Sequence, residues 1–139
     1  MDNKLEYIPG DLVMVKESAL QFTKDKIFKV ISSLSGGFVK VVMLNDSSTT
    51  YSISNNAVRP IPLTSEILEK NGWRTQNRWY YYLDVAEGFI SYIGIDFKHK
   101  SNKGHLYVEV DGNNMVEIQY CHELQHFLFG LGLNSEMEV

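Results

Sequence analysis

Within three short segments of residues 89–119, apolar side chains recur at every second position, and this alternation constrains the fold more than any other feature. The apolar positions are Ile93, Ile95, Phe97, Leu106, Val108, Val110, Val116 and Ile118. Tyr92 and Asp96 fall on the opposite side of the extended chain from Ile93, Ile95 and Phe97. A period of two belongs to β-strands, and one apolar side is typical of an antiparallel sheet with one buried face.

Turn and helix signals surround these strands. Asp111-Gly112-Asn113 suits the tight turn of a hairpin between the last two strands. Thr64 or Ser65 can cap a short helix ahead of the sheet, and a closing helix is expected over roughly residues 120–131. Residues 63–139 therefore predict an α+β domain made of a helix, a four-stranded antiparallel sheet and a C-terminal helix.

The first half of the chain has the pattern of five short β-strands. Gly36-Gly37 supplies the positive φ that a tight hairpin needs between two of them. Pro60 and Pro62 bracket Ile61 and should hold this segment extended, which suits a domain boundary. We therefore predict a small SH3-like β-barrel in residues 1–62, followed by the α+β domain.

Composition limits the environment of the protein and its chemistry. The chain is 44% apolar and 22% charged, which is normal for a folded protein. Cys121 is the only cysteine, which excludes an intrachain disulfide and any multi-cysteine zinc site. The first ten residues lack the apolar core of a signal peptide, and no stretch of the sequence has the length of a membrane span. A cytoplasmic location with no membrane partner is therefore expected.

Charge is distributed unevenly along the chain. Residues 1–62 hold seven basic and six acidic side chains, whereas residues 63–139 hold six and eleven, a net charge of −5. Neither half has the basic excess of a protein that binds nucleic acid mainly through phosphates. Lys98, Lys100 and Lys103 form one basic cluster in a polar hairpin. Weak nucleic-acid binding through this hairpin and the barrel stays open as an alternative, although charged side chains at a sheet edge also protect against aggregation.

The closing helix contains a short metal-site signature. His122-Glu123-Leu124-Gln125-His126 matches the H-E-x-x-H pattern of zinc proteases. In that chemistry two histidines one turn apart bind zinc, and the glutamate acts as general base for the attacking water. A zinc-dependent hydrolase with His122 and His126 as ligands and Glu123 as base is therefore an alternative function.

Two features of the sequence weigh against a catalytic zinc site. Such a site needs a third protein ligand, and the extended signature requires a glycine and a histidine where this chain has Phe129 and Gly132. At about 100° per residue, the apolar stripe of the helix lies away from both histidines, which should face solvent or the barrel. We therefore expect no cofactor, no catalytic residues and no bound metal, and we interpret His122, His126 and Phe129 as a binding face.

The aromatic segment 79–83, together with Tyr92, is a second candidate surface. Exposed aromatic rings can stack on nucleobases or sugars. The same segment also fits a half-buried strand, because aromatic residues are ordinary strand formers. The inward positions would be Trp79, Tyr81 and Leu83, and the outward ones Tyr80 and Tyr82. We favour the strand interpretation.

Two segments of the chain carry a recognisable pattern. They are VRPIPLTSEIL with NGW, at residues 58–68 and 71–73, and VEIQYCHELQ, at residues 116–125. They resemble a recurring type of small uncharacterised bacterial and prophage protein, which has a β-rich start, an "RPIPLTEEIL-KNGF" joint and a closing "YVHELQNLYFALTG" helix. In that pattern the position of His126 is commonly Asn. The type has no assigned activity, so the resemblance implies architecture and a phage or mobile-element context.

The sequence therefore predicts a non-enzymatic binding protein of α+β class. Its expected partner is another protein, and the expected binding residues are His122, His126 and Phe129, with Lys98, Lys100 and Lys103 as further candidates.

Overall fold

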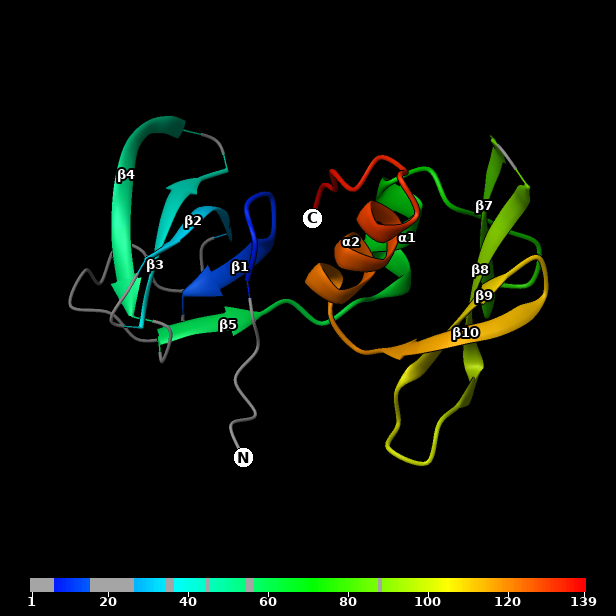
Figure 1. Ribbon diagram of the computed structural model, residues 1–139. Helices are drawn as coiled ribbons and strands as arrows, with labels where there is room; N and C mark the ends of the chain where they lie inside the picture. The colour runs from blue at the N-terminus through cyan, green and yellow to red at the C-terminus, as the bar shows by residue number, and fades with distance from the viewer. Residues whose placement is uncertain (1–6, 16–26, 35–36, 45, 55–56, 88) are drawn as a thin grey trace. The chain divides into compact units, whose positions relative to one another are not determined.

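The computed structural model describes residues 7–15, 27–34, 37–44, 46–54, 57–87 and 89–139. Its contacts divide the chain into two compact units (Figure 1). Unit 1 comprises Met1–Ile61 and Leu124–Glu136, and unit 2 comprises Pro62–Glu123 and Met137–Val139. Within the described ranges, no helix is both long and apolar enough to cross a membrane.

Unit 1 contains, among its described residues, a five-stranded antiparallel sheet. The strands are β1 (Leu12–Val15), β2 (Ile27–Leu34), β3 (Phe38–Met43), β4 (Asp46–Ser54) and β5 (Val58–Pro60). Their order is β4-β3-β2-β1-β5, so the described pairings leave β4 and β5 at the two edges and close no barrel. The β-rich character predicted for the first half of the chain is confirmed.

The predicted Gly36-Gly37 hairpin joins β2 to β3. Gly36 lies outside the described residues, whereas Gly37 has a φ of +83°, in the left-handed region that favours glycine. Next to the turn, Leu34, the last residue of β2, pairs with Phe38, the first residue of β3.

All five strands contribute buried side chains to the core of unit 1. The buried residues are Tyr7, Val13, Val15, Phe28, Val30, Val39, Val41, Ile53 and Val58. Phe28 is fully buried, and its ring packs edge-on against that of Tyr51, with 5.9 Å between the ring centroids. Buried positions repeat with a period of two within β1, β2 and β3, because successive side chains of a strand point to opposite faces.

Unit 2 contains, in the part of the chain that the structure describes, a second five-stranded antiparallel sheet. Its strands are β6 (Arg74–Thr75), β7 (Tyr80–Glu87), β8 (Ile90–Lys100), β9 (Leu106–Val110) and β10 (Asn113–Ile118), in the order β10-β9-β8-β7-β6. The sequence predicted four of these strands. The additional one, β6, pairs Arg74 with Tyr82 and Thr75 with Tyr81, and two residues are too few to show a period.

The inner face of the second sheet is apolar, as the alternation predicts. Its buried residues are Tyr81, Ile93, Ile95, Leu106, Val108 and Ile118. Val116 departs from the prediction, because it is 39% exposed. Val116 pairs with the buried Val108 and lies two residues before the buried Ile118, so it belongs to the inner face, and its exposure is that of a residue on the edge strand β10.

The hairpin between β9 and β10 has the predicted turn. Asp111 has a φ of 51° and Gly112 a φ of 87°. Two successive positive φ angles are those of the type I′ turn, whose twist matches that of the flanking strands. Asp111 Oδ1 also accepts hydrogen bonds from the backbone N–H groups of Ser91 (2.9 Å) and Tyr92 (3.0 Å), which fixes the turn against β8.

The short helix α1 (Ser65–Lys70) begins at the predicted cap, where the Thr64 side chain accepts a hydrogen bond from the backbone N–H of Ile67. Its C-cap is Asn71, and the chain turns away from the helix at Gly72, which has a φ of +86°. Leu68 is fully buried, and the Tyr81 hydroxyl donates to Glu69 Oε1 at 3.2 Å. Because Tyr81 belongs to the inner face of the second sheet, this bond ties α1 to that face.

The helix α2 (Cys121–Gly130) agrees with the predicted closing helix to within one residue at each end. Its apolar residues Leu124 and Leu128 are buried, as the predicted stripe requires. Beyond Gly130 the chain leaves the helix through Gly132, which has a φ of +75°, and the backbone N–H of Leu133 bonds to the carbonyl of Leu128 at 2.9 Å. With two antiparallel sheets and few helical residues, the described chain is a strand-rich α+β protein.

We expect Phe28→Ala to lower the free energy of unfolding by about 3–5 kcal/mol, because it leaves a cavity in the core of unit 1. Phe38→Ala, in the neighbouring strand, is the matched control: Phe38 is 43% exposed, and its loss should cost about 1 kcal/mol or less. Chemical denaturation of the two variants measures both values, and equal losses would contradict the assigned core.

Candidate functional site

The H-E-x-x-H segment lies in the first two turns of α2, where Glu123 acts as a cap. Its Oε1 accepts hydrogen bonds from the backbone N–H groups of Gln119 (2.8 Å) and Tyr120 (2.9 Å). Backbone amides at the start of a helix have no partner within the helix, and a carboxylate there also interacts favourably with the helix dipole. Glu123 thus stabilises the beginning of α2.

His126 contacts a buried carboxylate. Its Nε2 lies 3.0 Å from Oδ1 and 2.8 Å from Oδ2 of Asp11, which is 1% exposed. Asp11 Oδ2 also accepts a hydrogen bond from the backbone N–H of Ile8 at 2.8 Å. A buried carboxylate is destabilising unless it is paired and hydrogen-bonded. His126 and the Ile8 amide therefore stabilise the burial of Asp11.

Gln125 joins α2 to the same segment through its buried side-chain amide. Its Oε1 accepts from the backbone N–H of Leu12 at 3.0 Å, and its Nε2 donates to the backbone carbonyls of Gly10 (2.9 Å) and Ser135 (3.1 Å). The side chain thus accepts one hydrogen bond and donates two. An amide can make these bonds, whereas an apolar side chain of the same size cannot. Gln125 and His126 together attach α2 to the start of β1 within unit 1.

His122 is 2% exposed, so its ring does not face solvent. The ring stacks on that of Tyr120, with 6.0 Å between centroids and 16° between planes. His126 instead turns to Asp11 in the first half of the chain, one of the two environments expected from the sequence. The two histidines of the segment thus lie in different surroundings.

These contacts compete with the use of the segment as a zinc site. Among the described residues, no group of three or more His, Cys, Asp or Glu side chains is placed to hold a metal ion. His126 is engaged by Asp11, and Glu123 by backbone amides. Burial raises the pKa of the Cys121 thiol to about 12, so the neighbouring cysteine stays protonated and is a poor ligand.

We expect Gln125→Ala to lower the free energy of unfolding by about 2–4 kcal/mol, because it removes the partners of three backbone groups. The buried N–H of Leu12 alone costs about 1–3 kcal/mol when it is left unsatisfied. Gln119→Ala is the matched control, since that side chain is exposed and should change stability by about 0.5 kcal/mol or less. Denaturant titration compares the variants. A Gln125→Ala protein as stable as the control would show that this amide does not hold α2.

We expect untagged protein to retain well under about 0.1 equivalent of zinc after dialysis without chelator, because a tight site requires at least three protein ligands. Elemental analysis measures the metal content. Stoichiometric zinc that is lost in His122→Ala and His126→Ala, but kept in His99→Ala, would contradict the structural assignment and support the hydrolase alternative.

The outer face of the second sheet carries several tyrosine and carboxylate side chains. We name it the tyrosine face, and its members are Arg74, Tyr80, Tyr82, Asp84, Tyr92, Gly94, Asp96, Tyr107 and Glu109. The strand register places Tyr82 opposite both Arg74 and Gly94, and it places Asp84 opposite Tyr92. Tyr80 and Tyr82 are half-buried and point away from the buried Tyr81, as the sequence predicted.

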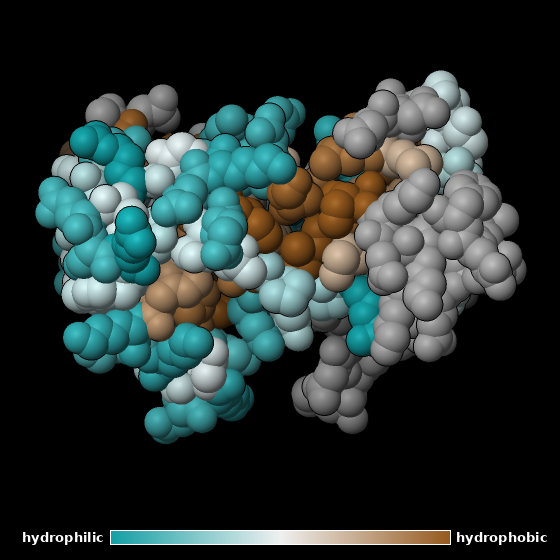
Figure 2. All heavy atoms as spheres, turned by 180° about the vertical axis from the view of Figure 1, so that it is seen from behind, coloured by the Kyte–Doolittle hydropathy of each residue, from teal (hydrophilic) through white to brown (hydrophobic). Residues whose placement is uncertain are grey.

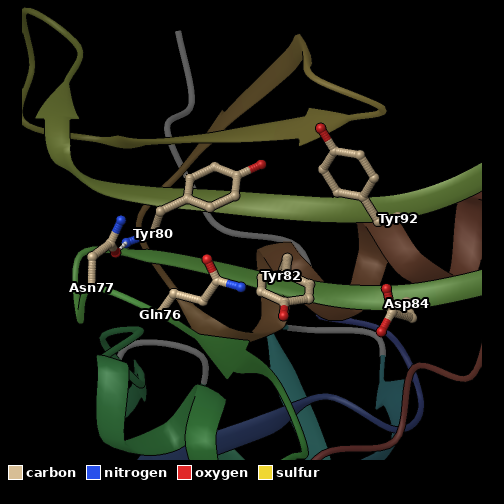
Figure 3. A pocket seen from close by; sticks show the side chains of 6 residues that line it. All are labelled: Gln76, Asn77, Tyr80, Tyr82, Asp84 and Tyr92. Carbon is tan, nitrogen blue, oxygen red and sulfur yellow. Dashed lines mark hydrogen bonds between the residues drawn. The ribbon is translucent and has the colours of Figure 1, made fainter.

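A pocket of about 340 Å³ opens on the tyrosine face (Figure 3). It is lined by Gln76, Asn77, Tyr80, Tyr82, Asp84 and Tyr92. Figure 3 shows the hydroxyl groups of Tyr80 and Tyr92 directed toward one another, while Tyr82 and Asp84 extend from β7 beside them. This volume is near the lower end of the range for ligand pockets, which suits a single side chain or a small ring.

Tyr80 is held in place by a glycine and a carboxylate. A Cβ atom at Gly94 would collide with the ring and hydroxyl of Tyr80, so the ring lies directly over the Gly94 backbone. The Tyr80 hydroxyl donates to Glu109 Oε1 at 3.2 Å. Burial, followed by the charge of Glu109 and the nearby Tyr92, raises the pKa of Tyr80, so its hydroxyl stays protonated as a donor.

Arg74, on the edge strand β6, contacts two of the residues that line the pocket. Its guanidinium carbon is 5.6 Å from the centroid of the Tyr82 ring, and its Nη1 is 3.1 Å from Asp84 Oδ2. Both charged side chains are more than half exposed. Planar guanidinium groups bind both aromatic faces and carboxylates. Sequence reasoning missed this arrangement, because the register of β6 cannot be read from two residues.

The basic cluster predicted from the sequence lies at the end of β8 and in the following hairpin. Lys98, Lys100 and Lys103 are exposed there. Lys98 Nζ lies 5.3 Å from the centroid of the Trp79 ring, which is half-buried rather than in the core. Asp96 accepts hydrogen bonds from the backbone N–H groups of Lys98 (2.8 Å) and His99 (2.9 Å), so a carboxylate lies beneath the cluster.

Phe129 is the exposed member of the predicted α2 face, with 67% of its surface accessible. The other exposed large apolar residues among those described are Ile8, Phe38, Leu44, Phe89, Met115 and Val116. Figure 2 shows strongly apolar as well as hydrophilic residues on one face of the described surface. Scattered apolar residues are normal on protein surfaces, so Phe129 by itself defines no site.

No protein-family model, curated protein or solved structure matches this chain.

Proposed function

We propose that this protein is a non-enzymatic binding protein that recognises a protein partner through the tyrosine face. The pocket between Tyr80, Tyr82 and Tyr92 is the observation that carries the proposal. Tyrosine supplies a large contact area with only two side-chain torsions to immobilise, and it is enriched at the energetic centres of protein interfaces. The rings also present hydroxyl groups that can bond to polar groups of a partner.

The polar groups of the pocket support binding rather than acid–base catalysis. Tyr80 donates to Glu109, and Asp84 pairs with Arg74. Asn77 Oδ1 accepts from the backbone N–H groups of Trp79 (3.1 Å) and Tyr80 (2.9 Å) and so fixes one wall. Polar groups that are oriented before a partner binds lose little entropy on binding.

The proposal moves the binding surface from α2 to the second sheet. Of the three α2 residues predicted from the sequence, His122 is buried and His126 contacts Asp11, which leaves Phe129 as the most accessible. We further propose that unit 1 is an SH3-like β-domain, and that the protein acts in the cytoplasm within a phage- or mobile-element-linked assembly. The resemblance from residue 58 onward supports this context.

We expect selection from a displayed random-peptide library against the full chain to yield peptides that bind through the tyrosine face. Their affinity should fall by about tenfold or more in Tyr82→Ala and Tyr92→Ala, as expected for central aromatic residues of an interface. Calorimetry with the synthesised peptides measures this loss. Phe129→Ala is the control, because it removes an exposed aromatic side chain from α2 and should leave the affinity unchanged.

Two results would overturn the proposal. Peptides whose binding depends on Phe129 and not on Tyr82 or Tyr92 would assign the binding surface to α2. Peptides recovered as hydrolysed fragments by mass spectrometry, with cleavage lost in Glu123→Gln, would replace binding with catalysis.

A further inference from the structure

We propose that the ligand group recognised by the tyrosine face is the guanidinium of an arginine side chain, presented by the partner to Asp84, Tyr82 and Tyr92. This inference rests on the proposed function and names the chemistry of its ligand.

The charge of the tyrosine face matches a cation. Asp84 lines the pocket, and Glu109 accepts a hydrogen bond from the Tyr80 hydroxyl, so two carboxylates lie among the tyrosine rings. Aromatic faces carry negative potential at their centres, so tyrosines placed among carboxylates add to the attraction for a positive group. Complementary charge of this kind also accelerates the encounter with a basic partner.

Arg74 shows how such a group fits. Its guanidinium lies over Tyr82 and bonds to Asp84, from an edge strand of two residues. The strand register places Tyr92 opposite Asp84, on the side of that carboxylate away from Arg74. A guanidinium entering from the pocket could therefore meet Asp84 between two aromatic rings, whereas Arg74 meets one.

Arg74 can be displaced by the ligand. The side chains of Arg74 and Asp84 are 68% and 59% exposed, and exposed ion pairs contribute little to stability. Their contact joins a single nitrogen to a single oxygen at 3.1 Å. A carboxylate can accept a bidentate pair from a guanidinium, and this geometry is stronger than one bond. Arg74 thus acts as an internal competitor for the same carboxylate.

The direct test is a titration of the full chain with the peptide acetyl-Gly-Ser-Arg-Ser-Gly-amide, followed by the NMR signals of the tyrosine rings. The matched probe contains citrulline, which keeps the shape of arginine and removes its charge. We expect dissociation constants in the millimolar range for the arginine peptide, and shifts at least about fivefold smaller for citrulline at about 10 mM.

Variants separate recognition from structural damage. Asp84→Asn and Tyr82→Leu should each weaken binding of the arginine peptide by about fivefold or more, because each removes one of the contacts. Arg74→Ala should strengthen it by about twofold or more, since the competitor is gone. Two controls make the same charge changes at exposed positions elsewhere. Arg59→Ala matches Arg74→Ala, and Glu66→Gln matches Asp84→Asn. Neither control should change binding of the arginine peptide.

Several results would overturn the inference. They are equal shifts with the citrulline peptide, no shifts with the arginine peptide, weaker binding in Arg74→Ala, and ring shifts produced by maltohexaose in place of the peptide. The last result would assign a saccharide ligand. In each case the library peptides test the proposed function independently. It stands if their binding still depends on Tyr82 and Tyr92, and it fails if their binding does not.

Discussion

The attachment of α2 to the start of β1 is the interaction on which unit 1 depends. Gln125 and His126 reach Gly10, Asp11 and Leu12 from 113 to 115 positions further along the chain. The backbone groups and the carboxylate at the start of β1 are buried, so each needs a partner within the protein. The last helix therefore completes a unit that begins at the other end of the chain, and unit 1 requires residues from both ends.

The contacts of α2 account for four of the five residues of the H-E-x-x-H match in physical terms. Glu123 caps the helix, Leu124 is buried, Gln125 bonds to the backbone around β1, and His126 pairs with Asp11. Each residue type suits its contact without reference to a metal. An acidic residue in the first turn of a helix, and polar residues that bond to a neighbouring strand, are common in proteins. A helix can therefore carry the H-E-x-x-H pattern for structural reasons alone.

The sequence predicted the elements better than the contacts between them. Strands β7 to β10, the Asp111-Gly112 turn and both helices follow from periodicity and capping, which act over a few residues. The outward placement of Tyr80, Tyr82 and Tyr92 follows from the same period. The pairing of Arg74 with Asp84 and the contact of His126 with Asp11 depend on strand register and on long-range packing, which leave no local pattern. The exposure of Val116 on the edge strand β10 belongs to the same class.

Gly94 links the fold of the second sheet to the chemistry of its outer face. Glycine weakens a strand interior, so its presence in the central strand β8 needs a compensating contact. The Tyr80 ring supplies that contact by covering the Gly94 backbone, and the hydroxyl then reaches Glu109. A larger residue at this position would lift Tyr80 away from the sheet and change the wall of the pocket. The glycine therefore shapes the pocket although it offers no side chain to a ligand, and the shape of the tyrosine face is set by backbone as well as by tyrosines.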